Sequence, residues 1–302
     1  MEFDALQQCF SSASCVVTQA TSGLVIGLLM FLTASGLTLV FGVLGIANFA
    51  HGAFYMLGAY MAYTVYANTG SYLLAVAAAA VFAAACGAVF ERWIVRRLKG
   101  ADVMMQLVAC FALVLIIDDA AKLIWGPAAV SLGIPASMRV PPVQFQGGVI
   151  PVFYLALMAL SACIGLAIWL LLAHTPFGRT MRAVAELPLM ASALGKNVNL
   201  YAGVVLALGC GLAGVAGALA APMRAVLPGT GLSVLLESFV VVVIGGMGSI
   251  PGALVAALLL GFTRSFGSIG FPLFTEGLMF LFMVAVLVLR PQGLFARAVR
   301  TH

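Results

Sequence analysis

The chain has 302 residues, of which 64% are hydrophobic and 8% charged, and its mean hydropathy is +1.19. Soluble domains carry about 25% charged residues, so this composition excludes an ordinary soluble protein. Apolar runs of about 18 or more residues recur along the chain, each long enough to cross a membrane. The net charge of +5 does not indicate nucleic-acid binding, because most basic residues lie in short clusters beside apolar runs. We predict a polytopic membrane protein.

The basic residues predict the orientation of the chain. Ten of the 14 lysines and arginines form three clusters: Arg92, Arg96, Arg97 and Lys99; Arg179, Arg182 and Lys196; and Arg290, Arg297 and Arg300. Short loops rich in Lys and Arg stay in the cytoplasm, so we expect these clusters there. The first ten residues carry Glu2 and Asp4 but no basic residue, and they lack the positive region of a secretory signal. We expect an uncleaved N-terminus outside and a cytoplasmic C-terminus.

In chain order, apolar segments predict helices that cross the membrane. They cover about residues 18–40, 50–67, 71–95, 103–125, 149–172, 200–221, 232–247, 251–268 and 272–290. An outer loop is expected at 126–148. The segments at 232–247 and 251–268 are short and separated by GGMGSIPG, so either both cross or one is re-entrant. We expect an all-α membrane bundle of about eight to ten helical segments, some of them broken, with residues 1–302 as one domain.

Residues 36–60 combine the hydropathy of a membrane segment with polar and flexible residues. The stretch contains Asn48, His51 and five glycines: Gly36, Gly42, Gly45, Gly52 and Gly58. Hydrocarbon offers no hydrogen-bond partners, so a broken helix is tolerated only against protein or a wet cavity. Polar residues at this depth usually face the bundle interior or a transport path. For His51 a hydrogen-bonded helix contact is favoured over path lining and over catalysis, because no cysteine or carboxylate is near it in sequence.

The stretch 174–200 is the longest polar segment on the predicted cytoplasmic face. Its sequence, HTPFGRTMRAVAELPLMASALGKNVNL, predicts short amphipathic helices. Pro188 favours a turn between two of them, and Gly195 suits a C-terminal cap. Arg179, Arg182 and Glu186 share one helix face by their spacing, which leaves open whether they pair internally or with a partner. An ordinary basic interfacial loop is the alternative interpretation.

Two acidic residues near the outer end of the 103–125 segment are spaced to pair with a lysine. Asp118 and Asp119 precede Lys122 by four and three positions. This spacing favours an ion pair, with Lys122 extending toward the outer surface. A proton relay is the alternative.

Three further charges lie near the predicted outer ends of the last segments. Glu237 stands at the mouth of the glycine-broken region, where it serves either as a group that receives a substrate ammonium or as an interfacial carboxylate. Arg264 and Glu276 flank the last outer turn, and we expect them to pair.

Motifs for catalysis, metal binding and ATP hydrolysis are missing. The cysteines at 9, 15, 86, 110, 163 and 210 show no C-x-x-C spacing, which argues against a metal site. Cys9 and Cys15 are expected on the outer side of the membrane, where a disulfide between them is allowed but not required. Ser249 has no sequence context for a base, and there is no G-x-x-x-x-G-K-[ST] phosphate loop. We expect no catalysis and no bound cofactor, so a partner must supply any energy.

Several of these regions resemble the branched-chain amino acid ABC permease family of the LivH type. Residues 36–60 resemble its first signature, 240–261 (VVVVIGGMGSIPGALVAALLLG) its later glycine signature, and 287–295 (LVLRPQGLF) its C-terminal end. The stretch 174–200 follows the family pattern TPFGRAMRA, an acidic residue, an alanine-rich turn and LGIN. Leu187 and Lys196 depart from this pattern and leave partner specificity open. The resemblance extends from about residue 20 to residue 296.

The resemblance implies a permease subunit of an ATP-binding cassette importer in a bacterial inner membrane. The implied partners are a second permease subunit of the LivM type, two cytoplasmic ATPases that bind ATP and Mg²⁺, and a periplasmic binding protein. The implied ATPase-docking residues are Phe177, Gly178, Arg179, Arg182, Glu186, Ala191, Leu194 and Gly195. Branched-chain amino acids, amides, urea and aromatic acids all stay open as substrates.

We predict a substrate path along the glycine-broken regions. Its residues are Asn48, His51, Gly52, Tyr55, Glu237, Gly245 and Gly246. The alternative function is a secondary transporter driven by an ion gradient, in which Asp118, Asp119 and His51 carry protons. An intramembrane enzyme is a third alternative, which the missing motifs disfavour.

Overall fold

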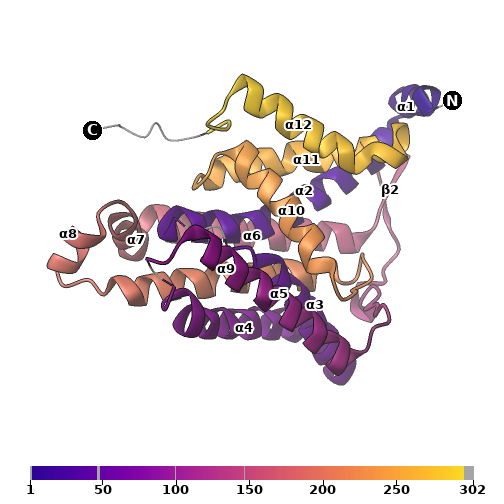
Figure 1. The fold of residues 1–302 in the computed structure, drawn as a ribbon. Coiled ribbons are helices and arrows are strands. Elements are labelled where there is room, and N and C mark those ends of the chain that lie inside the picture. The colour runs from indigo at the N-terminus through magenta and orange to yellow at the C-terminus, as the bar shows by residue number, and fades with distance from the viewer. Residues whose placement is uncertain (1, 46–47, 99, 146, 296–302) are drawn as a thin grey trace.

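The computed structural model describes residues 2–45, 48–98, 100–145 and 147–295, which are mostly helical (Figure 1). The α-helices are α1 Glu2–Ser11, α2 Ala13–Leu44, α3 His51–Thr69, α4 Tyr72–Phe90, α5 Val103–Trp125, α6 Val152–His174, α7 Pro176–Glu186, α8 Pro188–Ala193, α9 Val198–Ala220, α10 Thr230–Gly245, α11 Ile250–Gly270 and α12 Thr275–Leu289. A π-helical turn, η1 Glu91–Val95, extends α4, and two 3-10 turns are η2 Ala136–Met138 and η3 Pro272–Phe274. The strands β1 Val143–Phe145 and β2 Gly148–Ile150 form an antiparallel hairpin in which Gln144 faces Val149.

Each segment predicted to cross the membrane has a helix at its place. Within the described part of the chain, six helices are long and apolar enough to span a bilayer: Ala13–Leu44, Tyr72–Val95, Val152–His174, Val198–Ala220, Ile250–Gly270 and Pro272–Leu289. α10 is apolar but shorter. The prediction of a polytopic helical bundle is confirmed, and the small hairpin in the predicted outer loop is an addition to it.

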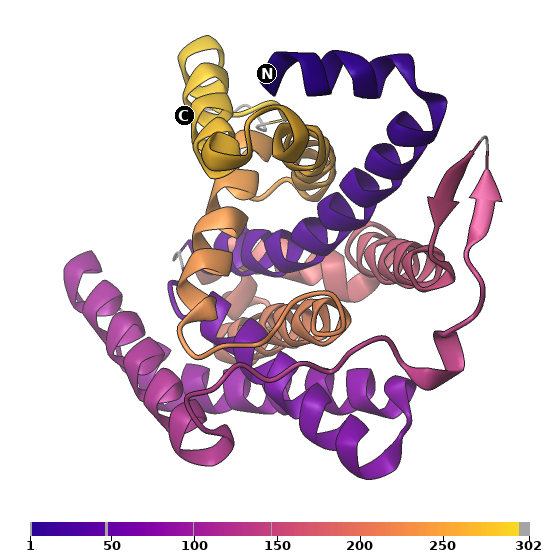
Figure 2. The same ribbon diagram turned by 90° about the vertical axis from the view of Figure 1, so that its right-hand side faces the viewer.

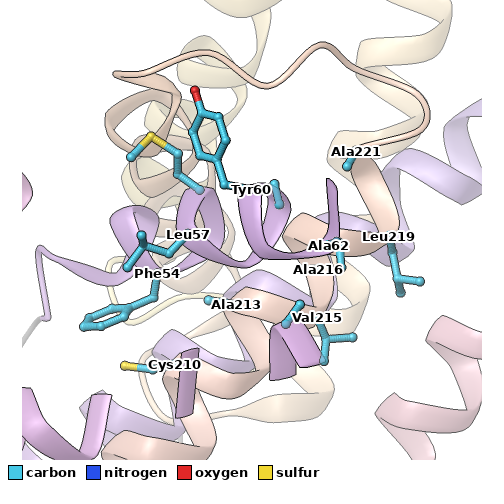
Figure 3. Packing of buried hydrophobic residues seen from close by; sticks show 14 of the residues in the cluster. Phe54, Leu57, Tyr60, Ala62, Cys210, Ala213, Val215, Ala216, Leu219 and Ala221 are labelled. Carbon is cyan, nitrogen blue, oxygen red and sulfur yellow. The ribbon is translucent and has the colours of Figure 1, made fainter. Parts of the chain in front are cut away.

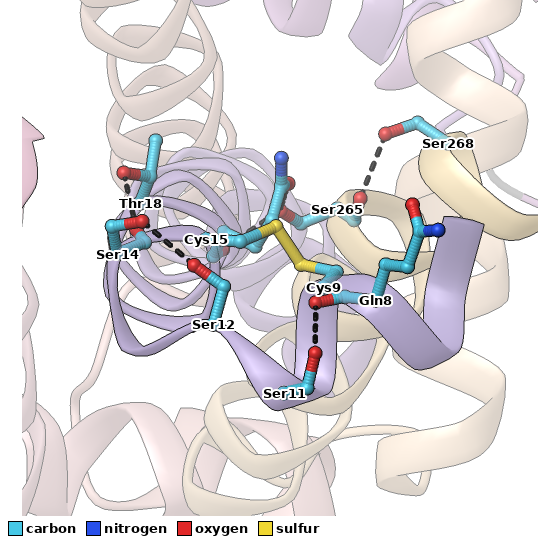
Figure 4. Close-up of a disulfide and its surroundings, with 10 residues drawn as sticks. Gln8, Cys9, Ser11, Ser12, Ser14, Cys15, Thr18, Ser265 and Ser268 are labelled. Atoms are coloured by element: carbon cyan, nitrogen blue, oxygen red, sulfur yellow. Dashed lines mark hydrogen bonds between the residues drawn. A yellow bond between two sulfur atoms is a disulfide. The ribbon is translucent and has the colours of Figure 1, made fainter. Parts of the chain in front are cut away.

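The elements outside the spans lie at two opposite ends of the bundle. α7 and α8 protrude at one end, and α1 lies with the hairpin at the other (Figure 1; Figure 2). We call these the α7–α8 end and the hairpin end. At the hairpin end Cys9 and Cys15 form a disulfide that joins α1 to the first turn of α2 (Figure 4). The pairing that the sequence left open is therefore present.

α2 is the central helix of the bundle. It packs against α9, α10 and α11, and every residue from Met30 to Val40 is buried. A helix that is apolar on all sides can be buried on all sides. Next to it, Phe54 and Leu57 of α3 lie in one apolar cluster with Cys210 and Ala213 of α9 (Figure 3). This α2, α3 and α9 contact forms the core.

Glycines at these contacts let the helix backbones approach closely, as in other membrane bundles. A Cβ on Gly58 of α3 would overlap the backbone of Gly214 in α9. A Cβ on Gly27 of α2 would lie 2.9 Å from the carbonyl oxygen of Ala257 in α11. Larger side chains at these positions would force the helices apart.

The first glycine-rich break lets α3 begin beside the middle of α2. α2 ends at Leu44, and Gly45 follows with a left-handed φ of 66°. α3 begins at His51, whose Nε2 lies 2.9 Å from the carbonyl oxygen of Thr33. Thr33 lies well inside α2, so the chain turns back along the bundle before α3 starts. Residues 46 and 47 lie outside the described residues.

The later break separates α10 from α11. α10 ends at Gly245, and Gly246 has a φ of 97°, a conformation that favours glycine. The last carbonyls of α10 accept hydrogen bonds from the chain that follows α12. The Leu294 amide donates to Ile244 O at 2.8 Å and the Phe295 amide to Gly245 O at 3.2 Å. These bonds satisfy groups that a helix end leaves without intrahelical partners.

Candidate functional site

The predicted docking segment forms the two short helices α7 and α8, and α7 is fixed to the end of α6. The Gly178 amide donates to Thr175 Oγ1 at 3.3 Å, and Pro176 occupies the first turn of α7. A Cβ on Gly178 would overlap the backbone of Leu172. The Arg182 guanidinium donates to the Leu172 carbonyl oxygen at 2.6 Å, which satisfies an acceptor at the end of α6.

The inner face of α7 packs on the bundle. Met181 is buried in a cluster with Leu39 of α2 and Val205 of α9. Phe177 lies against Tyr201 of α9, with ring centroids 5.9 Å apart. Because α7 contacts α2 and α9, a displacement of α7 would act directly on both helices.

The predicted docking residues divide into two sets. Phe177, Gly178, Arg182 and Ala191 are buried or half-buried, and Arg179, Glu186, Leu194 and Gly195 are exposed. Arg182 is used in its bond to the Leu172 backbone, whereas the partners of Arg179 and Glu186 stay a prediction. Leu194 is 81% exposed, and its neighbour Leu189, which the sequence analysis did not select, is 84% exposed. Exposed apolar residues with charges at their rim are typical of a protein contact surface.

The sequence analysis did not identify a half-buried ion pair beside this segment. Glu91 in η1 is 1% exposed, and its carboxylate lies 2.8 Å from the Arg96 guanidinium. Arg96 also donates to the Asn199 carbonyl oxygen at 3.4 Å, at the start of α9. The pair thus ties the end of α4 to the exit of the docking segment. The available signal was one acidic residue at the head of a basic cluster.

Asn48, His51 and Gly52 lie at buried helix contacts. Asn48 Oδ1 accepts a hydrogen bond from a backbone amide in the turn before α3, at 3.1 Å. His51 bonds the Thr33 carbonyl, and among the described residues its Nδ1 has no hydrogen-bond partner. A Cβ on Gly52 would overlap the carbonyl oxygen of Gly231 in α10. These three residues fix where α3 and α10 begin.

Tyr55 and Glu237, two other predicted path residues, line a cavity of about 140 Å³ between α2, α3, α9 and α10. We call it the small cavity. Its wall is largely apolar, with Ile26, Leu29, Met30, Ala220, Met223 and Val234, and it also contains Thr33, Arg224 and Ser238. Asn48, His51 and Gly52 are not part of this wall. They lie outside the wall, and His51 contacts it through its hydrogen bond to the Thr33 carbonyl oxygen.

Glu237 is held by two arginines. Its carboxylate accepts a hydrogen bond from Arg264 at 2.5 Å and lies 4.0 Å from Arg224. The predicted pair of Arg264 with Glu276 is wrong, because α11 packs beside α10 and brings Arg264 to Glu237. Arg224 was not selected from the sequence, although it is a lone cation between two apolar segments.

A large cavity of about 530 Å³ adjoins the small one. Ile26 and Met223 belong to both walls. The large cavity is lined mostly by polar residues: Gln19, Ser22, Arg264, Ser265, Ser268, Thr275 and Glu276. Gln19 and Ser22 lie in the first turns of α2, so the large cavity is nearer the hairpin end.

Gly245 and Gly246 lie far from both cavities along the bundle. A Cβ on Gly42 of α2 would lie 3.3 Å from Gly248 Cα, which places the later break beside the end of α2. Helix geometry separates Gly42 by about 14 Å from Thr33, the lining residue of the small cavity nearest to it on α2. The predicted path residues therefore occupy two levels of the bundle and form no single site.

The acidic residues of α5 have separate partners. Asp119 pairs with Lys122 at 2.8 Å, as the spacing predicted. Asp118 accepts a hydrogen bond from the Gly229 amide at 3.3 Å and so ties α5 to the loop before α10. Asp119 is largely exposed whereas His51 is buried.

Membrane-crossing helices around a charged cavity, with a fixed helical pair at one end, define a membrane transport protein. A family model described as the permease component of branched-chain amino acid transport systems matches residues 19–287, and the chain belongs to this family. It is a transmembrane permease subunit.

Three named relatives match most of the chain. The high-affinity branched-chain amino acid permease protein BraD of Pseudomonas aeruginosa is 30% identical, covering 92% of this chain and 95% of its own. LivH of Escherichia coli K12 is 28% identical with the same coverage. A probable branched-chain amino acid permease, LivH of Methanocaldococcus jannaschii, is 28% identical over 88% of both chains. No solved structure matches the chain significantly.

Proposed function

We propose that this permease is the membrane subunit of an ABC importer for branched-chain amino acids. In this proposal it works with a second, LivM-type permease subunit, two ATPases that bind ATP and Mg²⁺, and a periplasmic binding protein. The observation that carries the proposal is the α7–α8 pair, which presents exposed residues and is anchored to α2 and α9. The substrate class is supported by the names of the relatives, which are branched-chain amino acid permeases.

The proposed orientation places the α7–α8 end in the cytoplasm of a bacterial cell. The described members of the basic clusters support it, because Arg92, Arg96 and Arg97 precede α5 beside this end and Arg179 lies on α7. The disulfide at the opposite end also supports it, because disulfides persist in oxidising compartments. Lys99, Arg297 and Arg300, which belong to the predicted clusters, lie outside the described residues.

In this proposal α2 transmits movement from α7 to the small cavity. ATP binding favours one arrangement of the ATPases over another, and this difference in binding drives the change. In the proposed mechanism the ATPases move α7 and α8, and the Met181 contact passes the movement to Leu39 of α2. α2 continues from Leu39 to Thr33, Met30 and Ile26, which line the small cavity. Movement at the cytoplasmic end thereby changes access to the cavity.

Reconstitution with the partner subunits tests the proposed function. Proteoliposomes with the complete complex should take up leucine only when both ATP and the binding protein are supplied. The chain alone should hydrolyse no ATP. Leucine uptake by the chain alone, driven by a proton gradient without ATP, would contradict the proposal and support the secondary transporter.

A further inference from the structure

One ion pair and two apolar side chains link the walls of the two cavities. Arg264 belongs to the wall of the large cavity and Glu237 to the wall of the small cavity, and the two are bonded at 2.5 Å. Ile26 and Met223 line both cavities. The Arg264–Glu237 pair therefore bridges the walls of the two cavities.

The Arg264–Glu237 pair is half-buried, so separating the two side chains costs free energy unless other charged groups take their places. The side chains of Arg264 and Glu237 are 18% and 21% exposed, in contrast to 48% and 73% for the Lys122–Asp119 pair. Separating the two charges leaves the partly desolvated Arg264 without its carboxylate, and leaves Glu237 with only Arg224, at 4.0 Å. A solute that offers an anion to Arg264 and a cation to Glu237 would lower this cost.

We propose that the Arg264–Glu237 pair is a gate between the two cavities, and that a zwitterionic amino acid with an aliphatic side chain opens it by taking over both charges. The substrate carboxylate binds Arg264, for which a planar guanidinium is well suited. The substrate ammonium binds Glu237. The exchange leaves each side-chain charge paired with an opposite charge, which a solute without formal charges, such as urea, cannot provide. This inference rests on the proposed import function.

Three features of the surrounding walls fit this substrate. Arg224 lies 4.0 Å from the same Glu237 carboxylate and is 46% exposed, so the site holds two cations and one anion and retains an excess positive charge for a carboxylate. Beyond the gate, the small cavity offers Leu29, Met30 and Val234 to an aliphatic side chain. On the near side, Glu276 in the large cavity attracts the ammonium group.

Thiol labelling tests the gate. The reporter is Leu29→Cys, which lines only the small cavity, and Ser22→Cys in the large cavity serves as the positive control. The four free cysteines line neither cavity, so the parent chain supplies the background. The complete transporter in spheroplasts is treated with a membrane-impermeant methanethiosulfonate reagent, and the labelling rate is measured.

Loss of the pair should open the small cavity. In the Leu29→Cys background, Glu237→Gln or Arg264→Gln should raise the labelling rate about tenfold, because a half-buried pair contributes more than an exposed one. Arg264→Lys retains the charge and should label near the parental rate. The exposed pair is the matched control, so Asp119→Asn with Lys122→Gln should change nothing. Equal rates in all these variants would overturn the gate.

Leucine uptake tests the substrate. Both neutralising variants should lose leucine uptake about tenfold or more while they reach the membrane at parental levels and bind the ATPases. Faster labelling with parental leucine uptake would show a gate that does not recognise the zwitterion, and would overturn the proposed exchange. Failure of the parental complex to take up leucine would overturn the proposed function and the substrate class, whereas the labelling result would still decide the gate.

Discussion

The His51 imidazole Nε2 lies 2.9 Å from the backbone carbonyl oxygen of Thr33, and this contact joins the first residue of α3 to the middle of α2. Thr33 lines the small cavity, whereas His51 does not. His51 therefore lies one layer behind the cavity and sets the position of its wall. The structural interpretation of this histidine accounts for its burial and for its hydrogen bond.

His51 should be replaceable by a residue that still donates to Thr33. We expect His51→Asn to keep most leucine uptake, and His51→Leu to lower the free energy of unfolding by about 1 kcal/mol or more through loss of the hydrogen bond. Thermal unfolding in detergent and uptake in cells measure the two effects. A parental unfolding midpoint in His51→Leu, or a displaced pH profile of uptake in His51→Asn, would contradict this role.

Gly52 should tolerate no side chain, because a Cβ there would overlap the Gly231 carbonyl oxygen. We expect Gly52→Ala to destabilise the protein by about 1–3 kcal/mol, which is the usual effect of overpacking. A methyl group added at Gly277 in α12 would have no described atom within 4 Å, so Gly277→Ala is the matched control and should be neutral or slightly stabilising. Equal unfolding midpoints for the two variants would refute the packing argument.

The Glu91–Arg96 pair should stabilise the contact between η1 and α9. Glu91→Gln leaves Arg96 without its carboxylate, but Arg96 is 38% exposed, so the cost should be about 1–2 kcal/mol and not that of a fully buried pair. Thermal unfolding measures it, and Glu186→Gln, in an exposed acidic position of α7, is the control. An unchanged midpoint in Glu91→Gln would show that solvent replaces the pair.

The disulfide reports the orientation of the chain. If the hairpin end faces outward, reduction of intact spheroplasts should make Cys9 and Cys15 reactive to a membrane-impermeant maleimide, and without reduction they should not react. Cys9→Ser with Cys15→Ser gives the background from the other thiols. Labelling that requires permeabilised membranes would contradict the proposed orientation.

The sequence predicted those features that depend on local pattern. Apolar length predicted the helices, the prolines and glycines of 174–200 predicted the α7–α8 turn, and spacing predicted the Asp119–Lys122 pair. Contacts between distant segments were not predictable in this way. The partner of Arg264 depends on how α11 lies against α10, and the bond from Arg96 to the Asn199 carbonyl depends on η1 meeting α9.

The same limit applies to the candidate site. Glu237 and Tyr55 were selected, but Arg224 was not, since nothing near it in sequence marks it as part of a cavity. His51, Gly52 and Gly246 were grouped by their polar or glycine-rich context. That context marks chain breaks in general, and the structure shows that the two breaks lie at different levels of α2.

The central claim, that residues 174–200 form the ATPase contact, is tested most directly by the ratio of leucine uptake to ATP hydrolysis in the complete complex. Glu186→Arg reverses an exposed charge on α7, and Asp102→Arg makes the same change at an exposed residue before α5. We expect Glu186→Arg, and deletion of 184–192, to insert normally, to lower the ratio and to recover less ATPase on co-purification, while Asp102→Arg behaves like the parent. Parental coupling and parental ATPase recovery in Glu186→Arg and in the deletion would contradict the claim and favour the basic loop at 91–100 as the contact.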